Sequence, residues 1–220
     1  LMIREDKLEE SLANHVWAHK VSYTGPSFDV GMSYAYHFNE IPAVHVQPPE
    51  AVLEYHRQHS VGVEFETTWD EWGFRGEGVY TSDEWFASRN PVDRDSTEPR
   101  DILSAIVGAD HTFANDLYVN FQYWMRYITD YQDYLQAEEY DHNFIWSVSR
   151  KFLREDLEIG FSGRYQFDPA GWLVTPEVKY RVNDYIRLRA TLNLLGGDNA
   201  SLFGQFDGND QAGIELKMLF

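Results

Sequence analysis

The last nine residues, Ala212-Gly213-Ile214-Glu215-Leu216-Lys217-Met218-Leu219-Phe220, place an apolar side chain at every second position and end on an aromatic ring. Successive side chains of a β-strand point to opposite faces, so this period of two predicts a strand with one apolar and one polar face. The polar positions carry Glu215 and Lys217. The segment therefore predicts a strand that separates two different environments.

The same alternation recurs along the chain. It is clearest at Phe28–His37, where Phe28, Val30, Met32, Tyr34 and Tyr36 share one face. Further regular strands are expected at 117–127, 157–167, 172–181 and 186–194, and less regular ones near 14–24, 59–68, 73–81, 101–112 and 142–152. With the terminal segment, this gives about eleven strands, each close to the ~9–11 residues that a tilted strand needs to cross a bilayer.

The connections between these strands alternate in length. Short ones (24–27, 69–72, 113–116, 153–156, 182–184) alternate with long ones (38–57, 82–100, 129–141, 196–210), apart from the brief connection 168–171. Tight periplasmic turns and extended extracellular loops produce this pattern in membrane β-barrels, whereas a two-sheet sandwich gives no reason for it. The connections therefore favour a barrel over a soluble sandwich.

The composition fits this prediction. Aromatic residues make up 16% of the chain, and mean hydropathy is −0.49. The sequence contains no run of 18 apolar residues, so it predicts no transmembrane helix. A net charge of −18 argues against a nucleic-acid partner, because phosphate binding relies on clustered Lys and Arg. The chain has no cysteine, so disulfides and thiolate metal sites are excluded.

The terminal aromatic Phe220, preceded by Leu216 and Met218, resembles the ending of Gram-negative outer-membrane β-barrel proteins of the porin-like kind. The resemblance is one of pattern over residues 14–220 and of sequence only at the terminus. It implies an all-β fold, a transmembrane antiparallel up-and-down β-barrel in the bacterial outer membrane, surrounded by lipid and lipopolysaccharide. It also implies that Phe220, Met218 and Leu216 form the assembly signal read by the barrel assembly machinery.

A periplasmic Phe220 orients every strand. Counting back places the short turns in the periplasm, the long loops outside and the start of the first strand, near Asn14, at the extracellular end. Because bacterial barrels have an even number of strands, an odd count suggests the carboxyl-terminal portion of a larger barrel. Residues 1–13 are then an extracellular loop or an amino-terminal extension, although a twelfth strand within 1–12 is the alternative; that stretch looks more helical, with Leu1, Leu8 and Leu12.

Energy decides which face meets lipid. Turning the strand at Ile186 over would place Arg187 and Arg189 in hydrocarbon, at about 2–4 kcal/mol each near the midplane. The aromatic side chains then gather in two belts: Tyr34, Tyr36, Tyr80, Tyr165, Phe167 and Trp172 near the outer interface, and Tyr23, Phe74, Tyr180 and Phe220 near the inner one.

The lumen side collects a basic ladder. The inward basic residues are Lys20, Arg75, Arg126, Arg164, Lys179, Arg181, Arg187, Arg189 and Lys217, and their densest patch, the ladder itself, spans three neighbouring strands at Arg164, Lys179, Arg181, Arg187 and Arg189. Such a ladder predicts an outer-membrane channel for passive diffusion of small, anionic solutes, since lumen residues tune selectivity. The alternative is structural pairing with Glu158, Glu177 and Glu215 across strands.

The acidic residues concentrate in two outer loops, at 83–101 and 130–141. They suit a solvated surface or divalent-cation bridging to lipopolysaccharide phosphates. A second functional hypothesis is a plugged structural barrel that binds a partner protein or surface ligand through these loops. Association with further copies of the chain is left open.

Catalysis and metal binding find little support in the sequence. Glu54, His56 and His59 lack the HExxH spacing, so a surface loop with incidental histidines is expected and no metal site is predicted. Ser22, Ser33, Ser60, Ser147 and Ser162 offer inward hydroxyls, but a nucleophilic serine also needs a neighbouring His. We expect neither an enzyme nor a cofactor.

Overall fold

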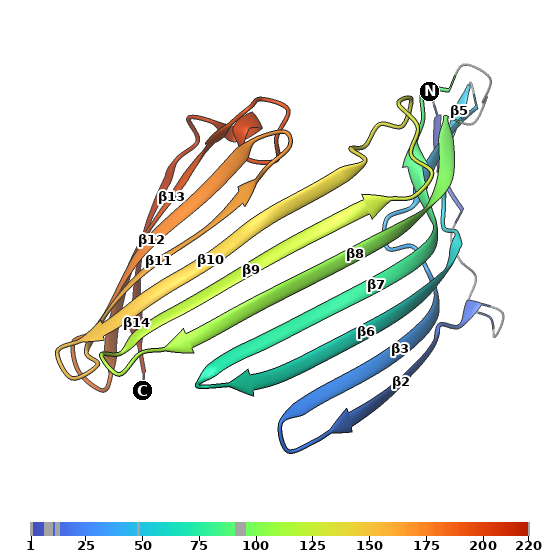
Figure 1. Cartoon of the computed structure of the whole chain (residues 1–220). Coiled ribbons are helices and arrows are strands. Elements are labelled where there is room, and N and C mark those ends of the chain that lie inside the picture. Colours follow the sequence, from blue (N-terminus) through green and yellow to red (C-terminus); the bar gives the residue numbers. More distant parts are fainter. Residues whose placement is uncertain (1, 7–10, 12–13, 48, 91–95, 220) are drawn as a thin grey trace. The chain divides into compact units, whose positions relative to one another are not determined.

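The computed structural model describes residues 2–219 except 7–10, 12–13, 48 and 91–95, and these residues form an all-β fold with one short 3-10 helix, η2 (Gly204–Phe206) (Figure 1). Eleven strands build a large antiparallel sheet: β2 (Trp17–Thr24), β3 (Phe28–Phe38), β6 (Arg57–Trp69), β7 (Trp72–Ala87), β8 (Thr97–Thr112), β9 (Leu117–Ile128), β10 (Tyr140–Phe152), β11 (Leu157–Gln166), β12 (Gly171–Arg181), β13 (Ile186–Gly197) and β14 (Gln211–Met218). No helix in the described part of the chain is long and apolar enough to span a membrane.

The large sheet is a meander. Its order, β14-β13-β12-β11-β10-β9-β8-β7-β6-β3-β2, follows the chain apart from the excursion between β3 and β6. Tight turns make neighbouring strands antiparallel. At Asp70 and Glu71, which join β6 to β7, both φ angles are positive (48° and 69°), as the two-residue turn that matches the twist of a hairpin requires.

The excursion forms a second, three-stranded sheet. In it β5 (Glu50–Glu54) pairs antiparallel with β4 (Ala43–Gln47) and parallel with β1 (Met2–Glu5). The eleven strands of the large sheet confirm the sequence prediction, whereas the strand at Met2–Glu5 contradicts the helical tendency expected there. Because β1 pairs with β5 and not with β2, it is no twelfth strand of the large sheet.

The connection predicted at 82–100 is wrong in extent. β7 continues to Ala87 and β8 begins at Thr97, so Asp83, Glu84, Glu98 and Asp101 lie on strands instead of in a loop. Backbone pairing beyond the apolar stretch explains the difference, since the ladder needs no apolar side chain. Asp93 and Asp95 fall outside the described residues.

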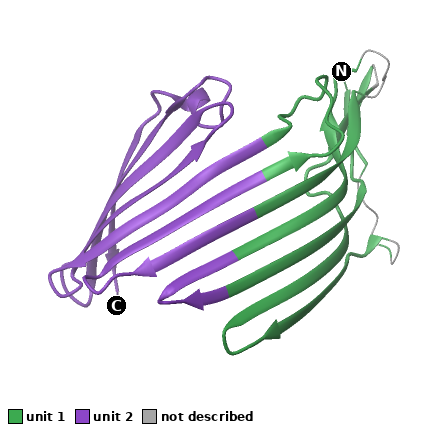
Figure 2. Ribbon diagram, viewed as in Figure 1, with its two compact units in different colours: residues 1–66, 76–105, 126–140 green, residues 67–75, 106–125, 141–220 purple. Residues whose placement is uncertain are grey.

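Contacts between Cα atoms divide the chain into two compact units (Figure 2). Unit 1 comprises residues 1–66, 76–105 and 126–140, and unit 2 comprises residues 67–75, 106–125 and 141–220. Unit 1 contains the small sheet and a cluster of buried Phe86, Ile128 and Leu135. Unit 2 contains β11 to β14 in full.

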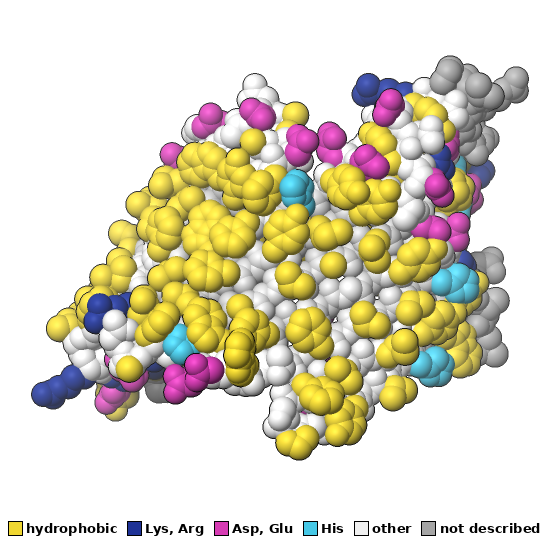
Figure 3. Space-filling view, in the orientation of Figure 1, with side chains coloured by type: hydrophobic (Ala, Val, Ile, Leu, Met, Phe, Trp, Pro, Cys, Tyr) yellow, Lys and Arg dark blue, Asp and Glu magenta, His cyan; other side chains and the backbone are white. Residues whose placement is uncertain are grey.

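Many apolar side chains of the described residues are exposed, and many polar ones are buried. Among the described residues the buried polar side chains outnumber the buried apolar ones, with Asn143 and Ser201 fully buried, while Ile214 is 86% exposed. Figure 3 shows hydrophobic side chains gathered over the strands in view. Contiguous exposed apolar surface of this kind marks a membrane or protein contact.

Candidate functional site

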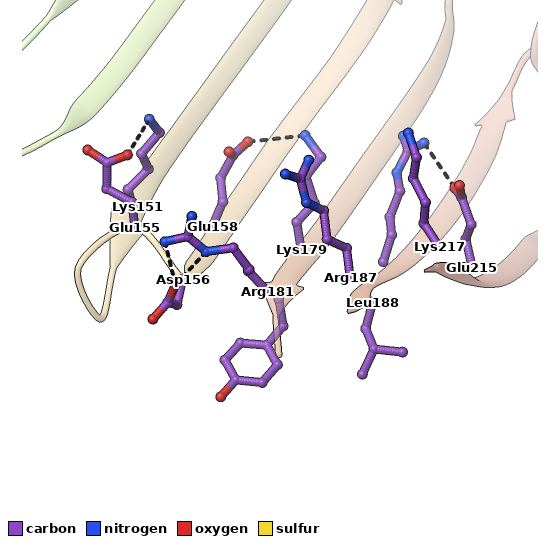
Figure 4. Close-up of a pocket in the computed structure, with 12 residues that line it drawn as sticks. Lys151, Glu155, Asp156, Glu158, Lys179, Arg181, Arg187, Leu188, Glu215 and Lys217 are labelled. Atoms are coloured by element: carbon purple, nitrogen blue, oxygen red, sulfur yellow. Dashed lines mark hydrogen bonds and ion pairs between the residues drawn. The ribbon is translucent and has the colours of Figure 1, made fainter. Parts of the chain in front are cut away.

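Strands β10 to β14 of unit 2 carry an open groove of about 450 Å³, here called the basic groove. Six cationic and four acidic side chains line it: Lys151, Lys179, Arg181, Arg187, Arg189 and Lys217, with Glu155, Asp156, Glu158 and Glu215 (Figure 4). In a chain with a net charge of −18, this local excess of cations distinguishes the groove.

Strand register brings the charges together. Arg187 of β13 lies opposite Arg181 of β12 and Lys217 of β14, and Arg189 lies opposite Lys179 and Glu215. The residues between them belong to the other face: Leu188 points away from the charged side chains in Figure 4, as the alternation of a strand demands.

One row of the groove is neutralised by ion pairs. Lys179 Nζ lies 3.1 Å from Glu158 Oε1 and 2.7 Å from Glu177 Oε1, and Arg189 Nη1 lies 3.8 Å from Glu215 Oε2. Arg189 Nε also donates to Glu177, whose side chain is only 15% exposed. This row supports the alternative of structural pairing that the sequence left open.

The second row is like-charged. Arg181 Nη2 is paired with Asp156 Oδ1 at 2.7 Å, but Arg187 and Lys217 make no ion pair with any residue that the structure describes. Like charges directly opposite one another on a sheet are unfavourable. Among the described residues, Arg187 and Lys217 are thus the groove bases whose positive charge no ion pair neutralises, and an anion beside them would relieve the repulsion.

The remaining bases predicted to point inward lie outside the groove. Lys20 Nζ is 2.5 Å from Glu64 Oε1, and Arg75 forms an ion pair with Asp110. Each of these two bases is paired with a carboxylate, and whether they face a lumen stays a prediction.

Two more predicted lumen residues are packed against rings. The Arg126 guanidinium lies 5.9 Å from the Phe86 ring centroid, and its buried Nε has no hydrogen-bond partner among the residues that the structure describes. Arg164 donates from Nε to Asn143 Oδ1 at 2.8 Å and lies 5.7 Å from the Trp124 ring. These contacts depend on cross-strand register and bulk, which alternation alone does not specify.

Every residue of the terminal strand β14 (Gln211–Met218) is exposed. Leu216 and Met218 are about half exposed (51% and 53%) and share a face with Ile214. Phe220, the third member of the predicted assembly signal, lies outside the described residues.

A histidine cluster in unit 1 was only partly anticipated. Glu54 and His56 meet His45 of β4, with the two imidazole Nε2 atoms 2.9 Å apart. His59, which the sequence grouped with them, instead contacts Tyr34 Oη through Nδ1 at 2.9 Å. Burial, reinforced by His45 and opposed by Glu54, lowers the pKa of His56.

One of the inward serines meets a histidine. Ser60 Oγ lies 2.9 Å from His37 Nε2 and 3.0 Å from Thr81 Oγ1. The other ring nitrogen of His37 contacts the Phe38 carbonyl oxygen at 2.8 Å, where a catalytic triad would place a carboxylate. This hydrogen-bond chain links neighbouring strands β3, β6 and β7.

Comparison with known proteins assigns no family. No family model matches the chain, and no curated protein matches it either.

Proposed function

We propose that this chain forms a passive channel of the bacterial outer membrane, through which small anionic solutes diffuse past the basic groove. The observation that carries the proposal is that β13 and β14 have one charged and one apolar face. One face presents Arg187 and Lys217, and the opposite face presents exposed Leu188 and Leu216 at adjacent positions of the same strands.

The apolar face suits lipid. Val178, Tyr180, Leu192 and Ile214 are all more than 40% exposed in unit 2. Exposing these apolar side chains to water costs free energy, whereas lipid hydrocarbon does not impose that cost. Strands that alternate apolar and polar side chains are typical of outer-membrane barrels. These exposed side chains therefore support membrane insertion.

Aromatic placement supports the same proposal. At one end of the β11–β12 pair Tyr165 lies opposite Trp172, and at the other end Tyr180 lies opposite Leu157. Trp172 and Tyr180 are exposed (36% and 41%). Amphipathic rings at both ends of the strands would suit two membrane–water interfaces.

A barrel is the form that we propose for the sheet in the membrane. The outer strands of its order, β2 and β14, carry backbone groups that need partners in hydrocarbon, where an unpaired N–H or C=O costs several kcal/mol. Closure of the strands into a barrel meets that need. The antiparallel meander of neighbouring strands is the topology from which such barrels are built.

The preference for anions would come from Arg187 and Lys217, whose charges no described carboxylate neutralises. An anion in the groove would approach Arg187 and Lys217 without competing with a protein carboxylate for them. The paired row contributes less, because Glu158, Glu177 and Glu215 already neutralise Lys179 and Arg189. The expected selectivity is therefore moderate and concentrated at two residues.

A second candidate function is partner or surface binding through the acidic connection between β9 and β10. The connection is anchored to unit 1: Leu135 is buried against Phe86 and Ile128, and Arg100 Nε donates to the Asp130 carbonyl oxygen at 3.1 Å. An anchored acidic surface suits a ligand such as lipopolysaccharide bridged by divalent cations.

Planar-bilayer recording tests the channel. The refolded chain should give stepwise conductance, and a KCl gradient should give a reversal potential of the sign that indicates anion preference. A chain that is folded and inserted but silent would refute the channel and leave the binding function. A conducting chain with cation preference would refute the role of the basic groove.

A further inference from the structure

We infer that His45, Glu54 and His56 form a binding site for one divalent transition-metal ion, with Zn²⁺ as the fitting candidate. The proposal concerns unit 1 alone and is independent of the basic groove. It rests on the geometry of three ligand atoms, on the surroundings of the two rings and on the elements that the site joins.

Three atoms define the site. His45 Nε2 and His56 Nε2 are 2.9 Å apart, and Glu54 Oε2 lies 3.8 Å from the first and 3.9 Å from the second. A triangle with these edges has its centre about 2.1 Å from every corner, which is the length of Zn–N and Zn–O bonds. An ion therefore fits with little movement of the side chains.

The donor set selects the kind of metal. Two imidazoles and a carboxylate suit Zn²⁺, Cu²⁺, Ni²⁺ or Fe²⁺, whereas Ca²⁺ and Mg²⁺ prefer an all-oxygen shell. Three protein ligands leave at least one coordination position for water. The ion would also replace the close approach of two nitrogens with two metal–nitrogen bonds.

The surrounding residues hold the two rings in place. His45 is 4% exposed, and its Nδ1 lies 3.0 Å from Oγ1 of buried Thr97, so donation from Nδ1–H would leave the Nε2 lone pair facing the site. The Trp85 ring stacks on His56 with centroids 4.0 Å apart and meets His45 edge-on at 5.2 Å.

The backbone at His56 is also fixed. Asn39 accepts a hydrogen bond from the His56 N–H through Oδ1 at 2.7 Å, and its own N–H donates to the His56 carbonyl at 3.0 Å. A ligand held at ring and backbone is the arrangement that metal sites require.

The elements that meet here indicate a structural role. His45 comes from β4 and Glu54 ends β5, while Trp85 and Thr97 belong to β7 and β8 of the large sheet. A bound ion would tie β4 and β5 to His56, which directly precedes β6 (Arg57–Trp69), and Thr97 and Trp85 contact its two ring ligands from the longer strands. It would stabilise the folded unit by mass action, because the unfolded chain offers no preformed site.

Metal titration tests the site. The full chain is folded in detergent without a polyhistidine tag, stripped with EDTA, and titrated with Zn²⁺ alone; bound metal is counted by mass spectrometry. We expect one ion per chain, and at least tenfold weaker binding in Glu54→Gln and His56→Ala. His59→Ala is the matched control and should bind as the unsubstituted chain does.

Two further measurements separate a site from a folding effect. Co²⁺ bound in place of Zn²⁺ should give the visible absorption bands of a four- or five-coordinate ion with nitrogen ligands. Thr97→Val, which removes the hydroxyl beside the His45 ring, should weaken Zn²⁺ binding about 10–100-fold while the circular dichroism spectrum stays the same. Failure to bind Zn²⁺ by the folded chain, or binding that Glu54→Gln leaves unchanged, would overturn the site. Either result would leave the channel proposal untouched.

Discussion

Arg187→Glu is the sharpest test of the proposed channel. Arg187 lies between Arg181 and Lys217 in the strand register and has no ion pair with a described residue, so the substitution breaks no salt bridge and changes the local charge by two. By contrast, reversal of Arg189 would disrupt its pairs with Glu177 and Glu215.

The magnitude follows from Coulomb's law. For an ion that passes about 8 Å from the side chain, the two-charge change shifts the ion's energy by roughly 1 kcal/mol in unscreened water. A Debye length of about 10 Å in 0.1 M salt reduces this to roughly 0.45 kcal/mol. Because a cation gains what an anion loses, the permeability ratio of Cl⁻ to K⁺ should fall about four- to fivefold.

Reversal potentials in KCl gradients measure this ratio. In 1 M salt, where the Debye length is about 3 Å, the change should shrink to roughly 1.3-fold. Arg89→Glu is the control, because it changes net charge equally at an exposed position outside the groove. An unchanged ratio in 0.1 M salt, or an equal shift in the Arg89 variant, would refute the reasoning.

Three further predictions concern unit 2, each measured by urea unfolding in lipid vesicles. Leu192→Arg, on the exposed apolar face, should lower the free energy of unfolding by about 2–4 kcal/mol if that position lies near the bilayer midplane. Thr191→Arg, on the opposite face, should lower it far less. Equal losses in the two variants would contradict a lipid-facing Leu192. Glu177→Gln should destabilise by about 1 kcal/mol, because it removes the carboxylate that joins two bases, and no loss would mean that these pairs contribute nothing. Gly163→Ala should cost about 1–3 kcal/mol, because a Cβ there would collide with the Trp146 indole; an unaffected variant would show that the indole moves freely.

The sequence predicted the eleven large strands because period-two alternation is a local signal that each strand carries by itself. It did not predict β1, β4 and β5, which have only four or five residues and include a parallel pair between residues 2–5 and 50–53. Alternation over so few residues is ambiguous, and a pairing at that separation leaves no local trace. Strand number was thus predictable, whereas the second sheet was not.

Of the candidate sites, the basic groove could be predicted in part from the sequence, whereas the histidine cluster could not. Lys179, Arg181, Arg187 and Arg189 could be grouped from the sequence because they lie on two strands joined by a short turn, and the register pairs Lys179 with Arg189 and Arg181 with Arg187; their role in a lumen stays a prediction. His45 was missed as a partner of His56, because their meeting requires the β4–β5 hairpin. The local spacing of histidines pointed to His59 instead.

The pairing of β13 also bears on how reliably the sheet folds. A slip of one residue against β12 would carry Arg187 and Arg189 to the side of Leu188 and Ala190, and would carry those apolar residues to the charged side. In a bilayer such a slip would raise the free energy at every position of the strand, because each side chain would move to the opposite face. The arginines proposed to attract solutes would therefore also act as a lock on registration, selecting one alignment of the hairpin while the sheet assembles.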